Sequence, residues 1–143
     1  MDPLDRVKAY KDTSYFLMLA AHQRGHEVFY LNPGNLVLEH DRVMGKVQQV
    51  TVSDDVKKPF LEKPLKWLAL DVMDVVWIRM DPPMDRSYLY ATLLLDFLPE
   101  SVLVVNRPST IRDWNEKLVA LRYPELTPRT LVTRDLIQIR AFM

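Results

Sequence analysis

Two charged side chains follow an apolar run near the middle of the sequence. The run 75–78 is followed by Arg79, Asp81 and two prolines. Prolines stiffen the exit of a strand, and the planar fork of an arginine suits a carboxylate or a phosphate. The stretch therefore indicates either a rigid turn tied by an ion pair from Arg79 to Asp81 or Asp85, or an anion-binding site at the end of a strand.

A second group of polar residues follows the apolar run 102–105. Asn106 comes directly after the run, and the next residues open a predicted helix whose first turn is a favourable place for an anion. Lys117 is a compact cation of the kind that contacts phosphates. The alternative is a solvated helix face with an i,i+4 ion pair between Arg112 and Glu116, and the residues by themselves favour this alternative.

Helices and strands alternate around these two groups. Asp12 and Asp85 are good helix N-caps, and Gly25 is a good helix stop. We predict helices over residues 13–24, 86–98, 108–121 and 134–142, and strands over residues 26–32, 74–80, 102–105 and 127–133. Two alternating segments within residues 36–52 predict a half-exposed peripheral hairpin around Asp41, and the polar residues 53–66 predict a loop or flap.

This order predicts an α/β fold with a mostly parallel sheet flanked by helices. Ligands bind such sheets outside the carboxyl ends of the strands, where Arg79, Asp81 and Asn106 are expected to lie. A fold of this kind normally opens with a strand, whereas this chain opens with what resembles the loop after one, and its last residues are helical. We therefore expect a piece of something larger that lacks its first strand.

Composition excludes several classes of function. The 143 residues suffice for one domain, and 19 basic residues balance 19 acidic ones, so no basic excess indicates nucleic-acid binding. The absence of cysteine excludes disulfides and thiolate metal sites, and the three histidines are scattered. No glycine-rich phosphate loop is present, and no apolar run approaches the roughly 20 residues of a membrane span.

Five stretches, at 1–3, 11–36, 76–92, 104–118 and 124–134, together resemble the bacterial glutathione synthetases. They include VWIRMDPPMDRSYLYAT at 76–92 and VVNRPSTIRDWNEKL at 104–118, and they occur in the family's order along most of the chain. The resemblance implies an ATP-grasp ligase that joins γ-glutamylcysteine and glycine through an acyl phosphate, with Mg²⁺ bridging the phosphates of ATP. It also implies a cytoplasmic homo-oligomer and a Rossmann-like N-terminal domain, of the pre-ATP-grasp type, that helps to bind the peptide substrate.

The resemblance also suggests roles for individual residues. It places Lys117 on the ATP phosphates and makes Arg79, with Asp81, Asn106 and Asn115, the candidates for substrate contacts. We expect the Arg79 and Lys117 heads to converge on one pocket. The expected domains are residues 1–115, for the peptide substrate, and residues 116–143, the start of an ATP-grasp domain.

The resemblance does not account for a complete catalytic site. The family's other ATP-binding residues and its metal ligands have no counterpart in this chain, so we expect no catalytic residue here and no ligase activity from the chain alone. The alternative hypothesis is a non-catalytic binding or subunit-interface module that keeps the N-terminal fold. A flavodoxin-like domain unrelated to ligases is a weaker third reading.

Overall fold

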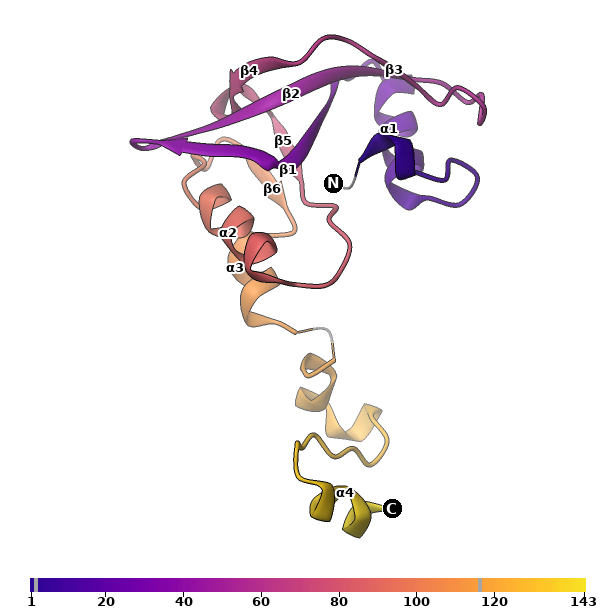
Figure 1. Cartoon of the computed structure of the whole chain (residues 1–143), viewed down its shortest axis with the longest axis vertical. Helices are drawn as coiled ribbons and strands as arrows, with labels where there is room; N and C mark the ends of the chain where they lie inside the picture. The colour runs from indigo at the N-terminus through magenta and orange to yellow at the C-terminus, as the bar shows by residue number, and fades with distance from the viewer. Residues whose placement is uncertain (2, 116) are drawn as a thin grey trace.

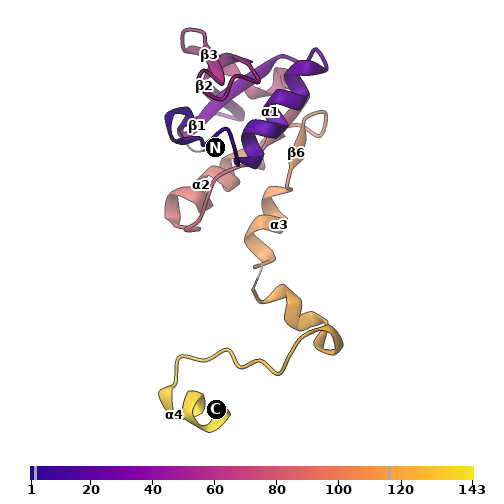
Figure 2. The same cartoon turned by 90° about the vertical axis from the view of Figure 1, so that its right-hand side faces the viewer.

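The computed structural model describes residues 1, 3–115 and 117–143 and shows an α/β fold. Figures 1 and 2 show a body that carries both sheets and the first three α-helices, from which the C-terminal segment leads away. The α-helices are α1 (Thr13–Gln23), α2 (Arg86–Leu95), α3 (Pro108–Asp113) and α4 (Leu136–Phe142). The strands are β1 (Val28–Glu39), β2 (Arg42–Val52), β3 (Phe60–Glu62), β4 (Lys66–Ala69), β5 (Val75–Trp77) and β6 (Leu103–Val105).

Helix starts follow the capping residues that the sequence offers. The Asp12 carboxylate accepts hydrogen bonds from the backbone N–H groups of Ser14 and Tyr15, and α1 begins at Thr13. Beyond the C-cap of α1, Gly25 adopts a left-handed conformation with φ +84°, which glycine reaches without a steric penalty. The predicted first helix is thereby confirmed, and so is the cap of α2 by Asp85.

The larger sheet is antiparallel, so the prediction of a mostly parallel sheet is wrong. A two-residue turn joins β1 to β2, because Glu39 pairs with Arg42, and strands joined so tightly must run in opposite directions. Both β3 and β4 also pair antiparallel with β2. Among the strands of the described residues, β5 and β6 alone are parallel, in a separate two-stranded sheet whose connection contains α2.

The sequence predicted a peripheral hairpin, but the β1–β2 hairpin forms the centre of the body. Alternate residues of β1 contact different groups of buried side chains: Val28 and Tyr30 pack with Tyr15 of α1, whereas Phe29 and Leu31 pack on the group that includes Val47 and Leu95 of α2. Alternate residues of the hairpin therefore contribute to two different cores, although each core covers only part of the sheet and Val37 and Thr51 remain exposed. The predicted flap, 53–66, supplies β3 to the same sheet.

The two parallel strands are less buried than their apolar sequences suggest. Val75 and Trp77 of β5 remain 48% and 47% exposed, and Leu103 of β6 remains 60% exposed. Val76 and Ile78 lie against the core group that contains Val47. The strand predicted over 74–80 therefore forms only over Val75–Trp77, and one face of this pair is covered by the rest of the described chain.

After α3 the chain departs from the predicted elements. The helix that begins at Pro108 ends at Asp113 and not near Leu121, and 3₁₀ turns follow at Val119–Arg122 and Pro124–Leu126. No strand forms over 127–133 among the described residues, although α4 begins behind its Asp135 cap close to the predicted position. No residue of the described segment 117–143 is buried, so local capping and turns, without a core, hold these elements.

Candidate functional site

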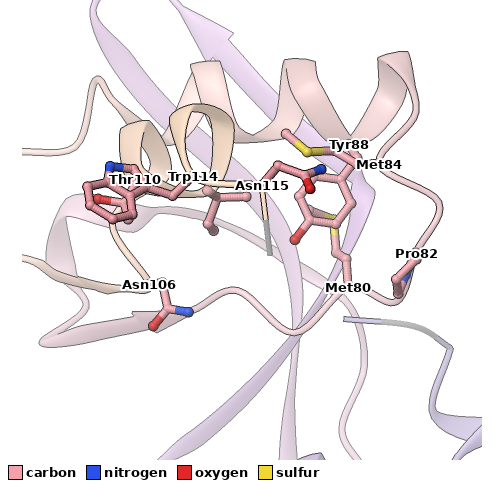
Figure 3. A pocket seen from close by; sticks show the side chains of 9 residues that line it. Met80, Pro82, Met84, Tyr88, Asn106, Thr110, Trp114 and Asn115 are labelled. Carbon is pink, nitrogen blue, oxygen red and sulfur yellow. The ribbon is translucent and has the colours of Figure 1, made fainter. Parts of the chain in front are cut away.

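A cavity of about 390 Å³ opens where the parallel strands end. The Ile78 N–H donates to the Val105 carbonyl at 2.7 Å. Beyond this hydrogen bond the segments that follow β5 and β6 separate. The cavity lies between the loop that follows β5, helix α2 and helix α3, as Figure 3 shows. Nine residues line it: Met80, Pro82, Met84, Tyr88, Asn106, Thr110, Ile111, Trp114 and Asn115. Its position agrees with the expected ligand site of a parallel sheet, and its volume lies within the usual range for small-molecule sites.

The loop after β5 is held in shape by a cap and by a bond to the first helix. The Asp85 carboxylate accepts a hydrogen bond of 2.8 Å from the Tyr88 N–H and so begins α2, which carries the Tyr88 ring into the cavity wall. At the start of the loop, the Arg79 Nε–H donates to the Ser14 hydroxyl at 3.2 Å. The loop is thus tied to α2 at one end and to α1 at the other.

An ion pair joins the two helices that border the cavity. The Arg112 guanidinium on α3 donates to the carboxylate of Asp96, the C-cap residue of α2. The Arg112 side chain is 18% exposed, and its Nη1 is buried without a hydrogen-bond partner. The predicted partner, Glu116, lies outside the described residues. The observed pair braces α2 against α3 at the side of the cavity.

The corner after α3 connects the cavity to Lys117. The Asn115 carboxamide oxygen accepts hydrogen bonds from the backbone N–H groups of Lys117 and Leu118 at 2.9 and 3.2 Å. Next to it, the Arg122 guanidinium lies 4.7 Å from the centre of the Trp114 ring, which is a cation–π distance. Two residues of the cavity wall therefore also shape the turn that carries Lys117.

The structure brings together two of the five residues that the sequence had singled out. Asn106 and Asn115 line the cavity, from the end of β6 and the end of α3. Arg79 and Asp81 belong to the loop after β5 but are not among the lining residues, and neither is Lys117. Arg79 forms an ion pair with neither Asp81 nor Asp85 in the described chain, so the rigid turn does not depend on such a pair.

The sequence reasoning also missed other lining residues, among them Met80, Met84, Tyr88 and Trp114. The methionines had been read as packing residues, because thioethers usually fill gaps in cores. All four lie inside the two motif stretches that drew attention for their charged residues. Their position in those stretches was the only available signal, because which side chains face the cavity depends on how the loop and the two helices pack.

Tyr88 is a titratable residue of the cavity wall. Burial raises the pKa of its phenol above the ordinary value, and the nearby positive charge of Arg79 partly opposes this by lowering the pKa. The phenol therefore stays protonated at neutral pH and can donate a hydrogen bond. It complements the two carboxamides and the Thr110 hydroxyl as neutral hydrogen-bonding groups of the cavity wall.

Comparison with known proteins identifies the family. A family model described as the N-terminal domain of prokaryotic glutathione synthetase matches residues 1–112. The chain belongs to this family. Curated glutathione synthetases of Shewanella oneidensis and Vibrio cholerae are 39% and 40% identical to it over 143 residues, which cover 99% of this chain. That of Coxiella burnetii is 38% identical over 134 residues.

The match to the glutathione synthetases covers a part of their length. The chain spans about 45% of the Shewanella and Vibrio proteins and 42% of the Coxiella protein. The matched N-terminal domain contains the loop after β5, helix α2 and helix α3 up to Arg112. Within the part of the chain that is described, no helix has the length and apolar character needed to cross a membrane.

Proposed function

We propose that this chain is the dipeptide-binding part of a glutathione synthetase, a ligase that joins γ-glutamylcysteine to glycine with ATP. The observation that supports this most is the coincidence of the family's N-terminal domain, residues 1–112, with a cavity at the carboxyl ends of β5 and β6. The unit β5–α2–β6 is then the Rossmann-like, pre-ATP-grasp part of the domain, with the antiparallel sheet added to it.

Arg79 is the proposed contact for a substrate carboxylate. Its Nε–H is engaged with Ser14, which anchors the stem, while the terminal nitrogens have no other hydrogen bond in the described chain. A guanidinium with free terminal N–H groups can hold a carboxylate through two parallel hydrogen bonds. Asp81 is the proposed supporting contact for an ammonium group, and Asn106 and Asn115 are the proposed supporting contacts for amide groups.

Lys117 is the proposed contact for an ATP phosphate. The Asn115 turn holds its backbone, and the segment 116–143 is proposed to begin an ATP-grasp domain, with residues 1–115 forming the substrate domain. Among the described residues, no group of three histidine, aspartate or glutamate side chains is placed to hold a metal ion. We therefore assign no ligand of Mg²⁺ to this chain, and no catalytic step. The cytoplasm and a homo-oligomer are the proposed setting.

The binding role is tested by calorimetric titration of the purified chain with γ-glutamylcysteine. Arg79→Gln is expected to weaken binding about tenfold, because it removes a charge-assisted hydrogen bond. Arg79→Lys should recover part of the loss, and Arg134→Gln, an exposed arginine near the C-terminus, should change nothing. A wild-type chain without affinity for the dipeptide would refute the role.

The alternative role, a binding or interface module without connection to catalysis, is tested by a second titration. The proposed function predicts that the chain binds ATP weakly through Lys117 and that Lys117→Met abolishes this binding. It also predicts no glutathione from the chain with ATP, Mg²⁺, γ-glutamylcysteine and glycine. Glutathione above background would overturn the assignment of catalysis to residues outside this chain.

A further inference from the structure

The cavity wall contains no charged side chain among the described residues. Five lining residues are apolar and four are neutral hydrogen-bonding residues. A γ-glutamyl dipeptide carries one ammonium and two carboxylates at neutral pH, and desolvating any of them without a charged partner costs several kcal/mol. A dipeptide in this cavity must therefore keep its charged ends outside and place an uncharged part inside.

The two ends of the cavity differ in chemistry. Figure 3 shows Met80, Met84 and Pro82, from the loop between β5 and α2, on one side of the opening, and Asn106 and Thr110 on the other. The first side presents two thioethers, which are soft and polarisable, with the Tyr88 phenol and the Asn115 carboxamide beside them. The second side presents an amide and a hydroxyl, which can bind a peptide group.

The backbone of the loop separates the charge from the sulfur. Arg79 and Met80 are successive residues, and the Arg79 side chain reaches Ser14 of α1 whereas Met80 lines the cavity. Successive side chains of an extended segment point to opposite sides, so the guanidinium and the thioether serve different parts of one ligand.

We propose that the end of the cavity formed by Met80 and Met84 receives the cysteinyl side chain of the dipeptide, and that these methionines determine specificity for that side chain. This inference rests on the proposed function, since it takes the dipeptide as the ligand. A thiol is a weak hydrogen-bond donor and loses little when it leaves water for a thioether-lined site. A hydroxyl of the same position loses more, because it forfeits strong hydrogen bonds to water.

The test is a titration of the purified chain with three probes that differ in one atom: γ-glutamylcysteine, γ-glutamylserine and γ-glutamyl-2-aminobutyrate. The serine probe is expected to bind about tenfold more weakly than the cysteine probe, and the aminobutyrate probe within about threefold of it. Met80→Gln and Met84→Gln place an amide at the same end and are expected to reduce the tenfold preference to about twofold. Met80→Leu keeps the site apolar and is expected to retain it.

Two controls separate specificity from stability and location. Met143→Gln alters a methionine that is 98% exposed at the C-terminus and should leave all three affinities unchanged. Nuclear magnetic resonance of ¹³C-methyl methionine should show the Met80 and Met84 methyl signals moving with the cysteine probe while the Met143 signal stays in place. Circular dichroism establishes that each variant is folded, and where a glutamine variant is not, the methyl signals of the wild-type chain carry the test.

The outcomes distinguish the two proposals. Equal affinity for the cysteine and serine probes, or binding that leaves the Met80 and Met84 signals unmoved, overturns the specificity inference and leaves the dipeptide-binding function standing. No binding of any of the three probes overturns the proposed function, and the inference with it.

Discussion

Strand β2 and the parallel pair β5–β6 are both rich in apolar residues, yet their surroundings differ. Val47 of β2 is 1% exposed, with β1 on one side and β4 on the other, whereas Val75 of β5 is 48% exposed. The two faces of β2 contribute to two buried groups, one with Tyr15 of α1 and one with Leu95 of α2. The pair β5–β6 has one covered face and leads into the cavity.

The difference shows that the two sheets contribute in different ways to one small domain. Among the described residues, the antiparallel sheet supplies six of the thirteen buried apolar side chains and β5 and β6 supply none, so the antiparallel sheet contributes more of the free energy that resists unfolding. The parallel pair contributes less burial and instead delivers two chain segments, beginning at Met80 and Asn106, to the two sides of a cavity. A loop can carry polar, ligand-facing residues when a separate core stabilises the body.

The largest expected effect is on the free energy of unfolding, and it compares the two sheets directly. Val47→Ala removes two methyl-sized groups from a fully buried site and is expected to lower the free energy of unfolding by about 2 to 3 kcal/mol. Val75→Ala, the same chemical change on the half-exposed strand, is expected to cost below about 1 kcal/mol. Urea unfolding followed by circular dichroism measures both. Equal losses would mean that the parallel pair carries as much of the core as β2.

A middle-sized effect concerns the turn beyond the cavity, where no residue is buried. Asn115→Ala removes the acceptor of the Lys117 and Leu118 N–H groups and should destabilise that turn by about 1 kcal/mol, as the loss of a helix cap does. Amide hydrogen exchange at these two residues should then become about fivefold faster, with little change in the global melting temperature.

The matched variant for this turn is Asn115→Asp, which keeps an acceptor oxygen in the same position. Its exchange rates at Lys117 and Leu118 should stay close to those of the wild type. A large fall in melting temperature for Asn115→Ala would contradict the view that the segment after α3 is held locally.

The smallest effect is a pH dependence at Tyr88. Its pKa is raised in the folded chain, so the stability that its neutral form contributes is fully present below the ordinary pKa of 10.0 and is lost as the pH rises through the higher, folded value. Tyr88→Phe should therefore flatten the decline in stability above pH 10. Because Arg79 lowers this pKa, Arg79→Gln should raise it further, which ultraviolet absorbance titration of the phenols can follow. Tyr10→Phe, at an exposed position, is the control.

The sequence predicted the starts of the helices and that polar residues follow the ends of two parallel strands. Asp12, Asp85 and Asp135 each cap the helix that follows, because a cap depends on backbone groups two or three residues away. The strand-end positions of Asn106 and the loop after β5 also followed from local pattern, and the motifs around them indicated the glutathione synthetase family before any comparison.

Only the tertiary structure decided how the strands pair and which of their faces are buried. Val47 pairs with Leu31 and Lys66, which lie 16 and 19 residues away, and no local pattern records that the two faces of its sheet contribute to two different cores. The same holds for the cavity wall, because whether Met80 or its neighbour Arg79 faces the cavity depends on α1, 65 residues away from Arg79 at Ser14. Capping is a matter of neighbours in sequence, whereas pairing and burial depend on neighbours in space.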